Sequence, residues 1–257
     1  MEANNKKLVH EYSVRPSECD YRGLLSVVSL CAMLQDTAGI HADKLGVGVG
    51  RLLGKNLTWM LSRFRLVVKK QADCRDAVTI TTWPSGKEKL FTFREFELRD
   101  EKGNMIAQAE TAWLIYDLAA RCLVRPFLYL EEQYLHERIF SEPMCKIALP
   151  VGFFNENDLP VRKGQIDINQ HANNLAYIEW ITESVPENIF FSSECCGIEL
   201  NYLSEVLISD KCVSRCMESA DTPGVFFHQI VKKESGSEVC RAVSRWKPFA
   251  SKYSALF

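Results

Sequence analysis

Along the first half of the chain, the spacing of hydrophobic positions changes from helix-like to strand-like. Residues 8–15 are expected to form a first strand that ends before Pro16. Residues 25–45 predict a long helix, and Gly46 lies where that helix would end. Its apolar stripe consists of Val28, Leu30, Cys31, Leu34, Ala38 and Leu45. Segments rich in β-branched and aromatic residues, separated by turn-forming residues, then predict antiparallel strands at 57–69, 77–84, 91–99 and 105–117.

The second half repeats this order of elements. A stretch rich in charged residues and proline separates the halves, and we place the linker at residues 138–152 within it. An approach strand at 158–166 and a helix at 173–185 follow, and further strands are predicted at 197–207, 211–218, 224–232 and 238–247. The repetition favours a duplicated α+β unit, with an N-terminal domain at residues 1–137 and a C-terminal domain at residues 153–257.

Composition narrows the class of protein. The length of 257 residues is sufficient for two domains. Lys and Arg (31) nearly balance Asp and Glu (33), which argues against a dedicated nucleic-acid-binding protein. The N-terminus shows no apolar signal segment, and the longest uncharged run, which begins at Gly23, is too short to span a bilayer. We therefore expect a cytoplasmic protein with no membrane span, whose ten cysteines are reduced and serve as small core residues.

Several known motifs fail on spacing or context. A glycine-rich stretch follows a helix rather than a strand, so it predicts a flexible connection and not a phosphate-binding loop: Gly46, Gly48, Gly50 and Gly54. No Gly-x-Ser-x-Gly elbow occurs, which disfavours a serine hydrolase of the α/β type. The histidines at the other positions are isolated and form no metal-spaced pair: His10, His41, His136 and His228. We expect neither a metal ion nor a cofactor.

One segment carries more polar chemistry than a helix cap explains. Residues 167–174 read Asp-Ile-Asn-Gln-His-Ala-Asn-Asn, and one of the last two asparagines would cap the helix that follows. The cap leaves Asp167, Asn169 and His171 without a structural role. These three residues alternate, so in an extended segment their side chains would project to one side.

This polar trio belongs to one repeat only. A Val-Arg pair precedes both Asp167 and Asp20 at the same spacing, so the corresponding residues of the first half are Asp20, Arg22 and Leu24. Such a difference is expected if one copy kept a site and the other became structural.

The location of the trio suits acyl chemistry. Free N–H groups and a partial positive charge at a helix N-terminus stabilise an oxyanion formed from a thioester or ester carbonyl. An imidazole such as that of His171 can relay a proton near pH 7, and a carboxylate can orient it or activate water. A second carboxylate, Glu205, is predicted within the strand after the helix. The alternative for the trio is a polar turn with only a structural role. The alternative for Glu205 is a strand residue that faces the solvent.

These residues resemble a motif of the acyl-acyl-carrier-protein (acyl-ACP) thioesterases of plants and bacteria, Asp-x-Asn-Gln-His-x-Asn-Asn followed by Tyr-Ile-x-Trp. Residues 167–174 match the first part, and residues 177–180 match the second. Residues 76–83 are similar to the family's strand ending in Thr-Trp, and residues 109–113 resemble its Ala-Thr-Ser-x-Trp segment. The resemblance extends over nearly the whole chain.

The resemblance implies two tandem hotdog domains, each a curved antiparallel sheet wrapped around a long helix. It implies hydrolysis of fatty acyl-ACP to free fatty acid and holo-ACP by direct water attack, which terminates fatty acid synthesis. The implied partner is acyl carrier protein bearing the acyl chain on 4'-phosphopantetheine, and a homodimer is expected. The first hotdog would supply the acyl tunnel and no catalytic trio; candidates for its lining are Trp59, Met60, Leu61 and Phe64.

Carried over residue by residue, the family's Asp, Asn and His fall on Asp167, Asn169 and His171. Its strand Glu falls on Glu205. Many plant members place a cysteine directly after that Glu, where this chain has Val206, so a covalent cysteine mechanism is not available at this position. The residue that activates the water is left open among Asn169, His171 and Glu205.

Two alternative functions stay open. A hotdog thioesterase acting on acyl-CoA would use the same chemistry with another carrier. A non-catalytic acyl-chain binding protein is less favoured, because all members of the polar trio are present. Docking of an acidic carrier cannot be assigned, because solvated charge explains each basic candidate equally well: Lys69, Lys70, Lys87, Lys89, Arg94, Arg162 and Lys163.

Overall fold

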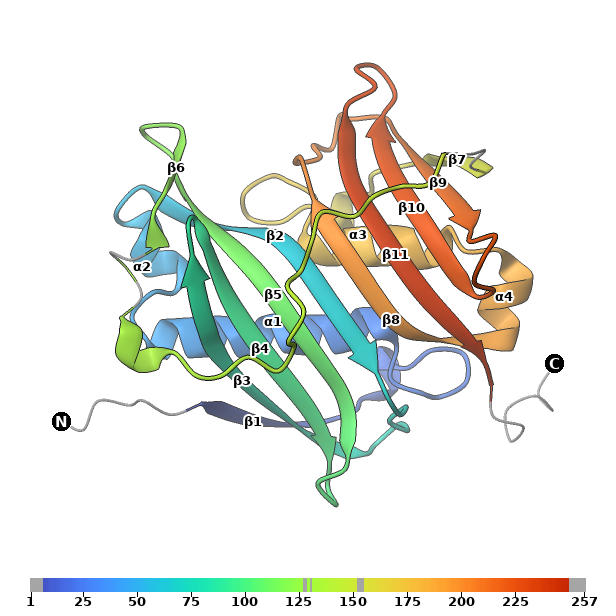
Figure 1. Cartoon of the computed structure of the whole chain (residues 1–257), viewed down its shortest axis with the longest axis horizontal. Coiled ribbons are helices and arrows are strands. Elements are labelled where there is room, and N and C mark those ends of the chain that lie inside the picture. The colour runs from blue at the N-terminus through green and yellow to red at the C-terminus, as the bar shows by residue number, and fades with distance from the viewer. Residues whose placement is uncertain (1–6, 127–128, 130, 152–154, 250–257) are drawn as a thin grey trace. The chain divides into compact units, whose positions relative to one another are not determined.

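A computed structural model of the protein describes residues 7–126, 129, 131–151 and 155–249 (Figure 1). The chain divides into two units, Met1–Pro143 and Met144–Phe257. The boundary between them lies inside residues 138–152, where the sequence predicts the linker. Some residues of the predicted linker and of both predicted domains lie outside the described residues: 1–6, 127–128, 130, 152–154 and 250–257.

The first unit is an antiparallel sheet packed against one long helix. Its strands pair in the order β1-β3-β4-β5-β2, and β6 pairs with β5. The strands are β1 (Leu8–Ser13), β2 (Leu57–Val68), β3 (Ala77–Glu88), β4 (Phe91–Asp100), β5 (Met105–Asp117) and β6 (Cys122–Val124). The helices are α1 (Val27–Lys44) and α2 (Val49–Leu53). The predicted first helix and the strands after it are confirmed.

Local sequence determines where α1 begins and ends. The Ser26 hydroxyl accepts the N–H of Ser29 at 3.1 Å and so caps the first turn. Gly46, just after the helix, has φ +74°, a conformation that glycine adopts without steric cost. The helix buries one face that includes a polar residue, His41, whose Nδ1 lies 3.0 Å from Nη1 of Arg94 on β4. This contact ties the helix to the sheet.

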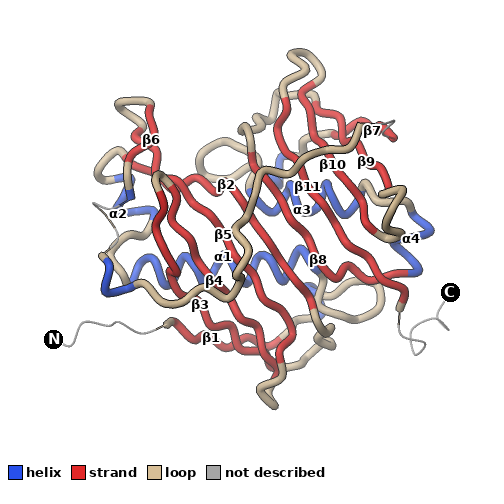
Figure 2. Tube along the Cα trace, viewed as in Figure 1, coloured by secondary structure: helices blue, strands red, loops and turns tan. Residues whose placement is uncertain are grey.

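The second unit has the same architecture. Its strands pair in the order β8-β11-β10-β9-β7, all antiparallel. They are β7 (Asn155–Leu159), β8 (Ser193–Tyr202), β9 (Cys212–Glu218), β10 (Val225–Lys232) and β11 (Glu238–Pro248). The helices are α3 (Asn174–Glu183) and α4 (Glu187–Ser192). Figure 2 shows one long helix lying along each sheet, which is the predicted α+β arrangement.

Several boundaries differ from the sequence prediction. The glycine-rich stretch contains the short helix α2 instead of a flexible connection throughout. The approach strand of the second unit covers only Asn155–Leu159, and a 3-10 turn at Lys163–Gln165 replaces its predicted end. α3 ends at Glu183, before its predicted end at residue 185, and Pro186 is the N-cap of α4, which the sequence did not predict.

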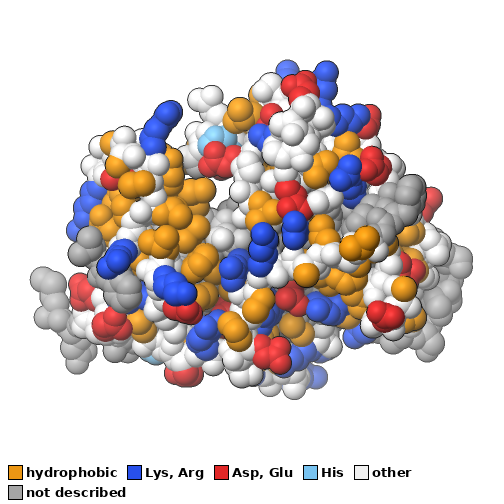
Figure 3. Space-filling model, turned by 45° about the horizontal axis from the view of Figure 1, so that its top comes forward, with side chains coloured by type: hydrophobic (Ala, Val, Ile, Leu, Met, Phe, Trp, Pro, Cys, Tyr) orange, Lys and Arg blue, Asp and Glu red, His pale blue; other side chains and the backbone are white. Residues whose placement is uncertain are grey.

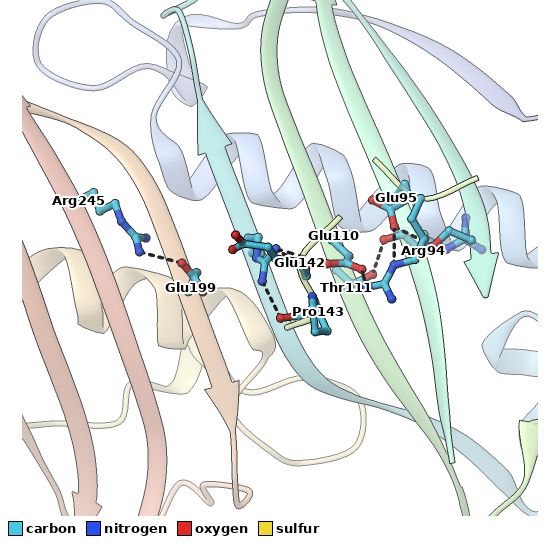
Figure 4. A network of polar contacts seen from close by, with 11 residues as sticks. Arg94, Glu95, Glu110, Thr111, Glu142, Pro143, Glu199 and Arg245 are labelled. Carbon is cyan, nitrogen blue, oxygen red and sulfur yellow. Dashed lines mark hydrogen bonds and ion pairs between the residues drawn. The ribbon is translucent and has the colours of Figure 1, made fainter. Parts of the chain in front are cut away.

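The segment that joins the two units lies on the sheet of each unit in turn. In the first unit, Arg65 on β2 donates to the carbonyls of Glu142 and Pro143 at 3.0 and 3.3 Å (Figure 4). In the second unit, the N–H of Ile147 donates to the side chain of Asn201 on β8 at 2.7 Å. The joining segment therefore has a defined path over polar side chains of the strands.

Candidate active site

The polar trio lies on a tight turn just before α3. The N–H of Asp167 donates to the carbonyl of His171 at 2.8 Å, and Ile166 pairs with Ala172, so the segment folds back on itself. Gln170 closes the turn with φ +66°, an uncommon conformation for a residue with a side chain. The expectation of an extended segment is therefore wrong, because the Asp167 side chain offers the backbone a better partner than an extended strand would.

Asp167 organises this turn. Its Oδ1 accepts the N–H of Asn169 at 2.8 Å and the N–H of His171 at 3.2 Å. Its Oδ2 lies 3.4 Å from Nδ2 of Asn169. A carboxylate that accepts several N–H groups holds a turn rigidly. Asp167 therefore fixes the positions of Asn169 and His171 on the turn.

His171 and Glu205 meet at the side of this turn. His171 Nε2 lies 3.2 Å from Oε2 of Glu205, and both side chains are partly exposed. Backbone pairing holds the two segments together, because the N–H of Ala172 donates to the carbonyl of Val206 at 2.8 Å. Glu205 itself lies beyond the end of β8, in the loop that follows Tyr202, and not within a strand as predicted.

The first turn of α3 adjoins the pair. Asn173 is the N-cap, and its side chain accepts the N–H of Ala176 at 2.8 Å. The helix runs from Asn174 to Glu183, so its positive end faces the turn that carries His171. Imidazole, carboxylate and helix N-terminus are the groups that stabilise an oxyanion and move a proton.

The first unit contains the same turn without these groups. Asp20 accepts the N–H groups of Arg22 and Leu24 at 2.9 and 3.3 Å, as Asp167 does for Asn169 and His171. Here the Asp20 carboxylate is also paired with the Arg22 guanidinium at 2.6 Å. Leu24 bridges to Asp73 where His171 bridges to Leu207, so Gln71 is the residue of the first unit that corresponds to Glu205.

The buried cysteines are poor candidates for a nucleophile, because burial disfavours the thiolate form. All ten cysteines are free, and burial raises the pKa of the Cys212 and Cys216 thiols to about 11. Five are buried, but Cys122 and Cys145 are exposed, so the prediction of core positions holds for only part of the set. The side chain of Val206, next to Glu205, is fully buried.

Basic and acidic side chains are mixed on one face of the protein (Figure 3). The face drawn in Figure 3 carries basic and acidic side chains interspersed with hydrophobic ones. Two of the basic candidates for docking are buried, since Arg94 is 9% exposed and the Lys87 side chain is 3% exposed. Within the described ranges, His, Cys, Asp and Glu side chains form no group of three or more that could hold a metal ion.

Two family models match most of the chain. A model of the acyl-ACP thioesterase N-terminal domain matches residues 5–126, and a model of the C-terminal domain matches residues 150–248. The chain belongs to the acyl-ACP thioesterase family. This family membership confirms the resemblance found in the sequence.

Acyl-ACP thioesterases from plants and bacteria are similar over most of the chain. A palmitoyl-acyl carrier protein thioesterase of Gossypium hirsutum is 30% identical, covering 95% of this chain and 64% of the relative. One from Arabidopsis thaliana is 29% identical, covering 91% of this chain and 62% of the relative. Both relatives are named as chloroplastic, and this chain spans less than two thirds of their length.

Solved structures of acyl-ACP thioesterases share the fold. One from Bacteroides thetaiotaomicron aligns with a TM-score of 0.83 and 26% identity, covering 96% of this chain and all of the other. A 12:0-ACP thioesterase from Umbellularia californica aligns with a TM-score of 0.81 and 20% identity, covering 95% and 98% of the two chains. The fold is thus two tandem hotdog domains, as the resemblance implied. None of the helices in the described ranges has both the length and the apolar character needed to cross a membrane.

Three further side chains around the site of this acyl-ACP thioesterase family member were not predicted from the sequence. Gln165 is buried, and its amide donates to Glu179 on α3 at 2.7 Å. Tyr177 and Tyr202 donate to backbone carbonyls of the site segments. A signal existed only for Tyr177, which lies in the Tyr-Ile-x-Trp part of the family motif.

Proposed function

We propose that this protein hydrolyses the thioester of fatty acyl-ACP to free fatty acid and holo-ACP, and so terminates fatty acid synthesis. The observation that carries the proposal is the 3.2 Å approach of His171 Nε2 to Glu205 Oε2 beside the start of α3. Membership of the acyl-ACP thioesterase family supports the nature of the substrate.

The proposed reaction is direct attack by water. Glu205 accepts a proton from the water as its oxygen bonds to the thioester carbon. N–H groups at the start of α3 and the amide of Asn169 stabilise the negative charge that develops on the carbonyl oxygen. Glu205 then passes this proton to His171, 3.2 Å away. When the tetrahedral species collapses, the carbon–sulfur bond breaks, and His171 gives the proton to the departing pantetheine sulfur. Asp167 holds Asn169 and His171 in place throughout.

The other parts of the prediction belong to the same proposal. The first hotdog supplies the acyl tunnel, with Trp59, Met60, Leu61 and Phe64 as candidates for its lining. The partner is acyl carrier protein, the protein is a homodimer, and it acts in the cytoplasm without metal or cofactor. The relatives are named for palmitoyl, oleoyl and dodecanoyl substrates, so the preferred chain length is a matter for measurement.

Fatty acid release from a panel of acyl-ACPs of varied chain length, and from the matching acyl-CoAs, tests the proposal. We expect higher kcat/KM with acyl-ACP than with acyl-CoA. Glu205→Gln, His171→Ala and Asn169→Ala are each expected to lower kcat by about 10²–10⁴-fold, the usual contribution of acid–base assistance. Gln71→Ala changes the corresponding residue of the first unit and is expected to leave kcat unchanged.

Three outcomes would contradict the proposal. Near-normal kcat in all three site variants would contradict the catalytic roles assigned to these residues. A higher kcat/KM with acyl-CoA than with acyl-ACP would show that CoA is the carrier of the substrate. Tight binding of acyl-ACP without hydrolysis would indicate an acyl-chain binding protein.

A further inference from the structure

Two tyrosines join the segments that carry the site. The Tyr177 hydroxyl, on α3, donates to the carbonyl of Ser204 at 3.2 Å. The Tyr202 hydroxyl, at the end of β8, donates to the carbonyl of Asn174 at 3.1 Å. The two rings meet edge to face, with their centroids 5.1 Å apart. Each segment therefore donates one hydrogen bond to the other.

These hydrogen bonds end next to the reacting pair. Ser204 directly precedes Glu205, and Asn174, the first residue of α3, lies three residues after His171. Glu205 needs such support, because it lies in a loop and its side chain is 54% exposed. A side chain in an exposed loop loses its alignment easily unless its backbone is held.

The first unit shows that the fold does not require the hydroxyls. There the corresponding residues are Leu30 on α1 and Val68 at the end of β2, both buried. The backbone pairing of the two segments is nevertheless the same, since the N–H of Leu25 donates to the carbonyl of Ala72 at 2.9 Å. Hydroxyls at these two positions thus occur only in the unit that also has His171 and Glu205.

The Tyr177 hydroxyl stays protonated and can therefore always donate its hydrogen bond. Burial raises the pKa of the Tyr177 hydroxyl, and the nearby Cys240, Cys212 and Glu205 side chains raise it further. The hydroxyl therefore keeps its proton at any pH at which the enzyme would work. Its acceptor, the carbonyl of an exposed residue, can take water instead, so loss of the hydroxyl need not unfold the protein.

We propose that Tyr177 and Tyr202 are positioning residues that hold the Glu205 loop against the turn carrying His171. This inference rests on the proposed thioesterase function, and it adds residues that support the segments carrying His171 and Glu205. Their effect is on the alignment of Glu205 with His171, and neither tyrosine touches the substrate.

Single removal of each hydroxyl tests the inference. Tyr177→Phe and Tyr202→Phe keep the rings and are each expected to lower kcat by about tenfold, with KM for acyl-ACP and the melting temperature little changed. Tyr12→Phe is the matched control, because the Tyr12 hydroxyl lies 2.9 Å from Thr37 Oγ1 on α1 of the first unit. That variant is expected to keep the wild-type kcat.

A double variant shows whether the tyrosine acts through Glu205. If it does, Tyr177→Phe has no further effect on kcat in a Glu205→Gln background. A tenfold loss in both backgrounds would overturn the inference, and so would wild-type kcat in both single Phe variants. A fall in melting temperature that accounts for the loss of activity would assign the tyrosines to stability alone and also overturn it.

Failure of the proposed function can be distinguished from failure of the inference about the tyrosines. A wild-type protein with no activity on the acyl-ACP panel contradicts the function and leaves the geometry to be tested. Crystal structures of the wild type and Tyr177→Phe then decide: an unchanged separation of His171 Nε2 and Glu205 Oε2 would overturn the inference, and a longer separation in the variant supports it.

Discussion

Glu95 and Glu110 lie opposite each other on β4 and β5, and neither has any exposed surface. Arg138, from the joining segment, forms an ion pair with Glu110 and lies 4.0 Å from Glu95 (Figure 4). Burial, together with the neighbouring Glu110 carboxylate, raises the pKa of Glu95 to about 7, although Ser85 donates to it. Burial raises the pKa of Glu110 as well, despite Arg138 and Arg65. Burial therefore favours the protonated form of both carboxyl groups.

This carboxyl pair makes stability depend on pH. Glu95 keeps a proton in the folded protein between its ordinary pKa of 4.5 and about 7, whereas the unfolded chain loses it. The free energy of unfolding is therefore expected to fall as pH rises through this range. Glu95→Gln mimics the protonated group and is expected to flatten that fall, as measured by urea unfolding at several pH values.

Glu97→Gln serves as the control for this prediction. Glu97 lies two residues further along β4 and is ion-paired with Arg99 at 3.0 Å, outside the carboxyl pair. This control is expected to retain the wild-type slope of stability against pH. Equal slopes for the wild type and Glu95→Gln would contradict the prediction.

At the scale of elements, the same turn occurs in both units, at Asp20 and at Asp167, but only the second turn carries the polar trio. Sequence spacing matched Asp20 with Asp167 correctly, because the same backbone hydrogen bonds recur in both units. The expectation that the trio lies on an extended segment was wrong, since the segment is a closed turn. The position of Glu205 in a loop was also missed, because nothing local marks where β8 ends.

Removing the carboxylate from each turn separates stability from activity. Asp167→Ala and Asp20→Ala are each expected to lower the free energy of unfolding by about 2 kcal/mol, since both leave N–H groups without their charged acceptor. Only Asp167→Ala is expected to lower kcat, by about 10²-fold, because small displacements of reacting groups are costly. Urea unfolding and acyl-ACP hydrolysis measure the two effects. A comparable loss of kcat in Asp20→Ala would contradict the assignment of the site to the second unit.

At the scale of the whole molecule, the joining segment is bound to each sheet by side chains that point away from the long helices. The indole of Trp83 donates to the carbonyl of Glu137 at 2.8 Å, and Arg65 donates to two further carbonyls. In the second unit, Arg241 donates to the carbonyl of Ile147 at 3.1 Å. The sequence marked this stretch as a linker by composition alone, and these attachments were not predictable from it.

Proteolysis measures how firmly this segment is held. Trypsin can cleave after Arg138 only when the segment leaves the sheet. Arg65→Met removes two hydrogen bonds to the segment and is expected to speed that cleavage by about tenfold, followed by mass spectrometry. Arg99→Met, which removes contacts at the β4–β5 hairpin, is expected to leave the rate unchanged. An unchanged rate in Arg65→Met would show that other contacts hold the segment.

The sequence alone determined the α+β class, the duplication, the long helices and most strands. These features depend on the periodicity of apolar residues and on local signals, such as the Ser26 cap and Gly46, which act within a few residues. It also predicted the polar residues of the proposed site, through the motif at residues 167–174 and the strand Glu of the resembling family.

Only the tertiary structure decided how those residues meet. The contact between His171 and Glu205, the support from Tyr177 and Tyr202, and the burial of Glu95 all join residues distant in the chain. Such contacts depend on strand register and on which segments pack together, and no local pattern encodes them. Burial in turn shifts the pKa of Glu95, because loss of solvent penalises the charged form.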